Sequence, residues 1–208
     1  MTPAAFIPLS SLHDRATRWF DRAQAALLDA LPCRRGCSAC CHGPFAITVL
    51  DAAELQRGLA SLDPAVRRGL VERASRQAAA LEAAEPRLRA SPFLDGWSDA
   101  DQDALAERFG TLPCPALDAA GGCLIYAFRP VTCRTMGIPT ESGGIVEGAC
   151  SVQTFVPAVR LPAAIREEED RLAEQEAVAL GERLDAGPFT GEEVWLAYGF
   201  LADRVPVR

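Results

Sequence analysis

Eight cysteines form two groups in the sequence, and they are the residues whose type and spacing are best suited to chemistry. The first group follows the pattern C-x3-C-x2-C-C and the second follows C-x8-C-x9-C-x16-C. Separations of two or three residues let several sulfurs converge on a metal about 2.3 Å away, as in zinc and iron–sulfur sites. We therefore predict that these groups bind metal: Cys33, Cys37, Cys40 and Cys41 in the first, and Cys114, Cys123, Cys133 and Cys150 in the second.

The adjacent pair Cys40 and Cys41 constrains how the cysteines divide between metals. Neighbouring side chains usually diverge, so we do not expect both to close one tetrahedron around a single ion. Two distributions stay open. Either two four-ligand sites each mix the two groups, or one cluster takes four ligands and the other cysteines are reactive, structural or bound to a second ion. Soft thiolates suit iron–sulfur clusters and zinc alike, so the metal is not identified.

Composition argues against several other classes of protein. The formal net charge of -7 comes from 28 acidic and 21 basic residues, without a basic block, so we expect no nucleic-acid partner. Every basic residue is arginine, which excludes a P-loop lysine and a Schiff-base lysine. No apolar stretch approaches the roughly 18 residues of a membrane span, and no signal peptide is recognisable, so we predict a cytoplasmic protein without membrane contact. Thiols stay reduced in that compartment.

Hydrophobic spacing and capping signals predict mainly α structure. The chain is expected to be a single domain over residues 1–208, in which helices frame two irregular cysteine-rich loops with at most a small β-hairpin. The metal-binding core covers about residues 33–150, and helical flanks cover 1–32 and 151–208. Asp51 and Glu54 resemble a capping box that opens a short helix, while Asp63 and Pro64 mark another helix start. The expected helices are about 15–31, from 51, 64–85 (with Val66, Leu70, Ala74, Ala78 and Leu81 on one face), 98–109, 162–184 and 192–201.

The segments CRRGCSACC and CPALDAAGGCLIYAFRPVTCR together resemble the YkgJ family of cysteine-cluster proteins, which are described as zinc- or iron-chelating domains. The resemblance runs from Cys33 to about Cys150. It implies that all eight cysteines are candidate ligands. It also implies that Tyr126, Arg129, Pro130 and Arg134 form the second characteristic element of the family.

Polar residues next to the thiolates are candidates for supporting the metal without binding it. Arginines lie in both loops, at Arg34 and Arg35 and at Arg129 and Arg134. Their charge would offset the negative charge of a thiolate-bound metal, or would hold an anionic substrate. His42 directly follows the first group as a nitrogen ligand, a proton carrier or a donor to a backbone carbonyl, and His13 is expected to be incidental. The predicted supporting set is His42, Tyr126, Arg129 and Arg134.

The favoured function is an iron–sulfur protein, most simply with a 4Fe–4S cluster in a redox or group-transfer role. The alternatives are a zinc-binding structural or adaptor module and a metal storage or delivery protein. Metal ions are the expected ligands, and a protein substrate or redox partner stays open. With two histidines and no lysine, any catalysis would have to be carried by the metal, and whether the protein is an enzyme is not decided.

Overall fold

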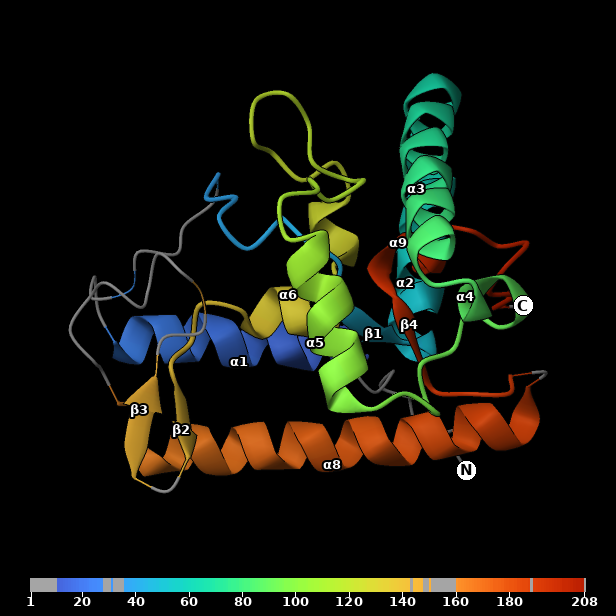
Figure 1. The fold of residues 1–208 in the computed structure, drawn as a ribbon. Helices are drawn as coiled ribbons and strands as arrows, with labels where there is room; N and C mark the ends of the chain where they lie inside the picture. The colour runs from blue at the N-terminus through green and yellow to red at the C-terminus, as the bar shows by residue number, and fades with distance from the viewer. Residues whose placement is uncertain are drawn as a thin grey trace, which may run out of the picture.

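A computed structural model of the chain describes residues 11–27, 31, 36–142, 144–147, 150, 160–187 and 189–207. Helices dominate this part of the chain and are joined by two small antiparallel sheets of two strands each (Figure 1). The predicted mainly helical class is therefore confirmed. The helices and strands are α1 (Leu12–Ala26), β1 (Ala46–Thr48), α2 (Val49–Ser61), α3 (Pro64–Ala84), α4 (Arg87–Ala90), α5 (Asp99–Arg108), the 3-10 helix η2 (Tyr126–Phe128), α6 (Val131–Thr135), β2 (Thr140–Ser142), β3 (Ile145–Glu147), α8 (Ala163–Ala186), β4 (Glu193–Trp195) and α9 (Leu196–Gly199).

Local capping chemistry sets several helix starts. Asp63 caps α3 by accepting from the amide of Ala65, with Pro64 in the first turn, as predicted. Ser98 caps α5 by accepting from the amide of Asp101, and the helix begins next to the predicted start at about residue 98. The predicted capping box at Asp51 and Glu54 is wrong, because α2 begins earlier.

Thr48 is the residue that caps α2, and its hydroxyl accepts a hydrogen bond of 3.3 Å from the amide of Asp51. Asp51 and Glu54 are thereby inside the helix and buried, which leaves their carboxylates available for long-range contacts. Ser11 similarly caps α1 with a full capping box, so that helix starts before the predicted Arg15. It ends at Ala26, and the end of the predicted stretch, residues 28–30, lies outside the described residues.

The predicted helix over 192–201 is wrong. Its first part is strand β4, which pairs with β1 in antiparallel register, with Ile47 opposite Val194, and only the single turn α9 follows. Val194 and Trp195 are both buried, so the segment is covered on both faces. A buried strand of this kind gives an unbroken apolar run that hydrophobic spacing alone does not separate from a buried helix.

The second cysteine region contains turns and one hairpin, as predicted, and β2 pairs with β3 there. It also contains two short helices, η2 and α6, that the sequence pattern did not predict. α6 starts directly after Pro130 and is five residues long, which is too short for a helical period to show. Helix α6 carries Cys133, one of the predicted metal ligands.

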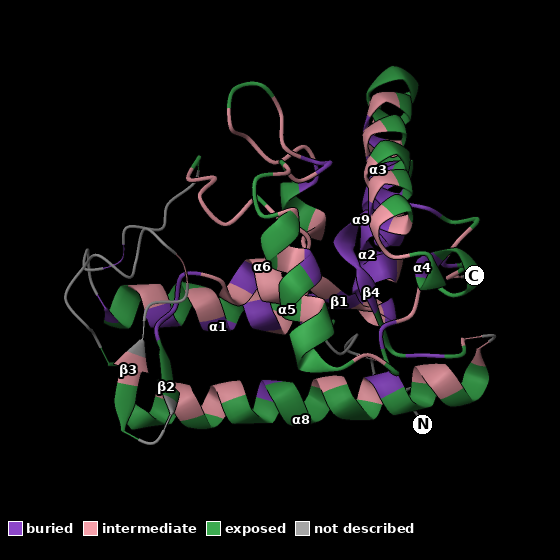
Figure 2. Cartoon of the chain, viewed as in Figure 1, coloured by how far each residue is buried: buried purple, intermediate pink, exposed green. Residues whose placement is uncertain are grey.

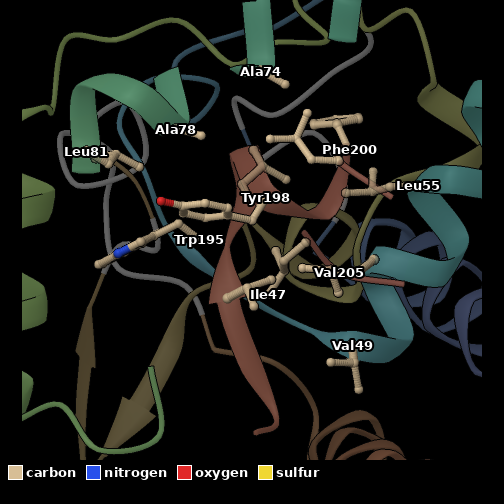
Figure 3. Close-up of a cluster of buried hydrophobic side chains, with 14 of the residues drawn as sticks. Ile47, Val49, Leu55, Ala74, Ala78, Leu81, Trp195, Tyr198, Phe200 and Val205 are labelled. Atoms are coloured by element: carbon tan, nitrogen blue, oxygen red, sulfur yellow. The ribbon is translucent and has the colours of Figure 1, made fainter. Parts of the chain in front are cut away.

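The described hydrophobic residues form two buried clusters. The larger lies where β1, α2, α3, β4 and α9 meet, around Ile47, Leu55 and Tyr198 (Figure 3). The smaller lies between α1 and α8, where the indole of Trp19 donates to the carbonyl of Ile165 at 2.9 Å. Leu50 packs against both clusters, and Figure 2 shows the buried residues where these elements meet.

Val66 was predicted to lie on the buried face of α3 with Leu70, but it is 39% exposed near the start of that helix.

None of the described helices is long and apolar enough to cross a membrane. The longest of them, α8, carries a run of acidic residues near its start.

Candidate metal centre

The two cysteine-bearing loops are paired through their backbones. The amide of Cys114 donates to the carbonyl of Cys41 at 2.8 Å, and the amide of Gly43 donates to the carbonyl of Leu112 at 2.7 Å. Gly43 has a φ of 82°, and a Cβ there would lie 3.3 Å from the Cα of Gly110. Glycine is therefore required twice over, for the left-handed backbone and for the close approach.

A tight turn presents the next two cysteines. Leu117 and Cys123 form an isolated antiparallel bridge, and the carboxylate of Asp118 accepts from the amides of Ala120 and Gly122, both at 2.8 Å. The amide of Ala116 donates to the sulfur of Cys114 at 3.4 Å. An N–H group directed at sulfur favours the thiolate form, which is the form that binds metal.

Cys133 is held in place by its neighbour Arg134, which is only 5% exposed. The guanidinium donates from Nε to the carbonyl of Arg129 and from a terminal nitrogen to the carbonyl of Ala127, both at 2.7 Å. It also donates to the hydroxyl of Thr17 on α1 and lies 3.7 Å from the carboxylate of Glu54 on α2. One side chain thus ties the loop around Cys133 to two helices.

The buried pair of His13 and Asp51 was not predicted from the sequence. Nε2 of His13, on α1, lies 2.8 Å from Oδ1 of Asp51, on α2. The same carboxylate oxygen accepts from the amide of Val131 at 2.9 Å, at the first residue of α6. His13 was expected to be incidental, but it joins α1 to the carboxylate that anchors the cysteine-bearing helix. No local signal in the sequence relates these residues, because the contact is long-range.

Six of the eight predicted ligands line one cavity of about 220 Å³: Cys37, Cys40, Cys41, Cys114, Cys123 and Cys133. All six are half-buried thiols. The rest of the wall is largely apolar, with Phe20, Phe45 and Met136 among its members, and α1 adds Asp21 and Gln24. Cys33 lies outside the described residues, as do Arg34 and Arg35. Cys150 is half-buried, and the described cavity lining does not include it.

Six of the described cysteines line this cavity, but they do not form a ready-made metal site. Within the described ranges, no three histidine, cysteine, aspartate or glutamate side chains form a group that would hold a metal ion as they stand. The donor chemistry nevertheless fits a soft metal, because the lining supplies six thiols and mostly apolar neighbours. Both Cys40 and Cys41 line the cavity, and that they do not close one tetrahedron around a single ion stays a prediction.

Neighbouring thiols and burial set the pKa values of these cysteines. A hydrogen bond from the Cys41 thiol lowers the pKa of Cys40 to about 6, and the same bond raises the pKa of Cys41. Burial raises the pKa of Cys114 to about 11 and also raises the pKa values of Cys123 and Cys133. The lowered pKa favours the thiolate form of Cys40, whereas metal binding at Cys41, Cys114, Cys123 and Cys133 must displace protons.

Arg129, a predicted supporting residue, contacts both Tyr126 and the backbone of Cys133. Its guanidinium stacks on the ring of Tyr126, 3.7 Å from the centroid, and donates to the carbonyl of Cys133 at 3.3 Å. Its positive charge opposes the effect of burial on the pKa values of Cys123 and Cys133. Tyr126, Arg129 and Arg134 all line the cavity.

His42 differs from the other three predicted supporting residues. It is exposed, it is not among the described residues that line the cavity, and its Nδ1 lies 3.2 Å from the carbonyl of Ser38. The contact is the backbone hydrogen bond that was one of the interpretations of this histidine. It joins the two ends of the segment from Ser38 to His42, which carries Cys40 and Cys41.

Cysteines lining one cavity are typical of a domain that binds zinc or iron, and a family comparison gives the same class of protein. Residues 32–151 match the model of the CxxCxxCC family, described as "Putative zinc- or iron-chelating domain". The match covers more than half of the chain, so this protein belongs to the CxxCxxCC family, the zinc- or iron-chelating family that its sequence resembles. A search of curated proteins gives no match, and a search of solved structures gives none either.

Proposed function

We propose that this protein binds an iron–sulfur cluster through its two cysteine groups and uses it in a redox or group-transfer role. The observation that carries the proposal is the cavity of about 220 Å³ with six cysteines around it. A single tetrahedral ion needs four donors about 2.3 Å from one point, whereas a cluster takes thiolates distributed around a larger body. The six described thiols line a cavity without forming a ready-made metal-binding group, which supports the second arrangement.

The remaining ligands in this proposal come from the same motif. Cys33 precedes Cys37 by the C-x3-C spacing, and we propose it as a further ligand. Cys150 stays a predicted ligand because of its place in the second group. With more sulfurs than one four-ligand cluster requires, the additional thiols would serve a second metal or remain reactive.

The protein's own residues give such a cluster its environment. When bound, the cluster supplies electron transfer or Lewis acidity. Arg129 places a positive charge beside Cys123 and Cys133, which offsets the negative charge of the thiolates. Apolar side chains such as Phe45 and Met136 limit water at the sulfurs, and Asp21 and Gln24 of α1 give one wall polar character. Reduced thiols of this kind suit a reducing compartment such as the cytoplasm.

Anaerobic purification followed by metal and acid-labile sulfide analysis tests the proposal. We expect brown protein with iron and inorganic sulfide in equal amounts and with visible absorption. Colourless protein with stoichiometric zinc and no sulfide would instead establish the zinc-binding structural module. More than two loosely held ions per chain at equilibrium would indicate storage or delivery, and either result would exclude an iron–sulfur cluster.

A further inference from the structure

Helix α3 contacts the chain on both sides of Cys114, although the helix belongs to neither cysteine group. Nε of Arg73 donates to the carbonyl of Pro115 at 2.8 Å, and Nε2 of Gln77 donates to the carbonyl of Pro113 at 2.6 Å. These prolines directly follow and precede Cys114 in the sequence. Two side chains of one helix therefore hold the backbone that flanks a predicted metal ligand.

Helix α3 is a fixed support because one of its faces is part of the larger hydrophobic cluster. That buried face consists of Leu70, Ala74, Ala78 and Leu81. Arg73 and Gln77 are half-buried and each directly precedes one of the buried alanines. Their spacing of four residues places them one turn apart on the same side of the helix. Both donors are therefore held by the hydrophobic core and not by the cysteine loops.

The contacts with α3 complement the contacts between Cys114 and the first cysteine group. The amide of Cys114 donates to the carbonyl of Cys41 at 2.8 Å, and Pro113 forms an isolated antiparallel bridge with His42. Proline has no amide hydrogen, so Pro113 and Pro115 are tied to a neighbour through their carbonyls. Cys114 consequently lies between the first cysteine loop and α3, and it is held from both directions.

We propose that Arg73 and Gln77 are positioning residues for the metal centre, which act by fixing the backbone of Cys114 where its sulfur lines the cavity. The inference rests on the proposed metal centre, in which Cys114 is a ligand. Residues that orient a metal ligand affect metal affinity nearly as much as the ligands do. A ligand that is already held in place also loses less conformational freedom when the metal binds.

Amide hydrogen exchange of the metal-loaded full chain tests the backbone contacts. Arg73→Met and Gln77→Met keep an unbranched side chain and remove the donor. We expect exchange of the Cys114 amide to become about tenfold faster in the first and about threefold faster in the second, since a charged donor makes the stronger hydrogen bond. The Arg134 amide in α6 should keep its wild-type rate. The matched control is Arg76→Met, an exposed arginine of the same helix, which should change neither rate.

Metal retention gives the second readout. Arg73→Met should transfer its metal to a chromogenic chelator about tenfold faster than the wild type. Arg73→Lys keeps a charged donor and should restore most of the retention. Zinc in place of an iron–sulfur cluster would refute the proposed function, yet both rates would still decide the role of Arg73.

Unchanged exchange at Cys114 in Arg73→Met, or unchanged metal transfer, would overturn the proposal. Equal acceleration at Cys114 and Arg134 would also overturn it, because that result indicates a general loss of stability. So would an effect of Arg76→Met as large as that of Arg73→Met.

Discussion

The amide of Cys114 donates a hydrogen bond of 2.8 Å to the carbonyl of Cys41, so the two cysteine groups are joined through the main chain. This contact positions sulfurs from distant parts of the sequence around one cavity. Main-chain pairing also means that the cavity is defined by loop geometry and not by the metal alone. Changes to that geometry should therefore affect metal retention without removing any sulfur.

Gly43→Ala is the first such change. The backbone at Gly43 has a φ of 82°, where an L-residue costs about 1–2 kcal/mol, and the new Cβ would press on the Cα of Gly110 at 3.3 Å. We expect the free energy of unfolding to fall by about 1–2 kcal/mol and the metal to be lost faster to a chelator.

Gly96→Ala is the matched control, because a Cβ there meets nothing within 4 Å. Its unfolding free energy should stay within about 0.5 kcal/mol of the wild type. Denaturant unfolding and the rate of metal transfer to a chromogenic chelator give both readouts. Wild-type metal release from Gly43→Ala would show that the paired backbone does not support the site.

Arg134→Gln tests the hydrogen bonds that the buried Arg134 guanidinium makes next to Cys133. The arginine is 5% exposed and donates to two backbone carbonyls and to Thr17, so its removal leaves buried acceptors without donors. We expect a loss of about 2–4 kcal/mol in unfolding free energy, together with reduced metal content. Denaturant unfolding of the purified variants measures the first effect, and metal analysis measures the second.

Arg160→Gln provides the comparison for Arg134. Arg160 is an exposed arginine paired with Glu141, so its replacement should change stability by less than about 1 kcal/mol. If the two variants lose equal stability, the buried contacts of Arg134 do not contribute what the structure indicates.

These contacts also show where prediction from the sequence succeeds. Asp63 with Pro64 and Ser98 act on residues within one turn, and both helix starts were predicted correctly. The cysteine motif likewise identified the family, because its residue types and spacings are read directly from the sequence. Signals of this kind depend on the chemistry of neighbouring residues, which the sequence displays directly.

Prediction failed where a distant partner decides the structure. Val194 lies in a strand because it pairs with Ile47 on β1. His13 is buried where its side chain contacts the carboxylate of Asp51 on α2. Neither partner is close in sequence. Arg134 was predicted only to offset the negative charge of the thiolates. In the structure, its guanidinium donates mainly to backbone carbonyls.

Glu176 should make stability depend on pH. Burial, with a further contribution from the charge of Asp51, raises the pKa of Glu176 to about 7, above its ordinary value of 4.5. The folded protein therefore holds this proton more tightly than the unfolded chain does. Its contribution to stability is greatest below about pH 4.5 and declines as pH rises towards 7.

Glu176→Gln should remove this decline and raise the unfolding free energy at pH 8 by about 1 kcal/mol, since the partly buried carboxyl is still screened by solvent. Denaturant unfolding at pH 5 and pH 8 gives the comparison. Glu174→Gln, an exposed position on the same helix, should keep the wild-type difference between the two pH values. A Glu176→Gln protein that retains the full wild-type difference would contradict the assignment.

We propose that the two cysteine groups form one metal centre. The most direct measurement is the metal and sulfide content per chain of Cys40→Ser and Cys133→Ser, which remove one lining sulfur from each group, with Ser38→Ala as the control from the same loop. We predict that each cysteine variant loses the centre as a unit, while the control keeps the wild-type content. Cysteine variants that each retain half of the metal, with its spectrum unchanged, would show two independent sites and contradict the claim.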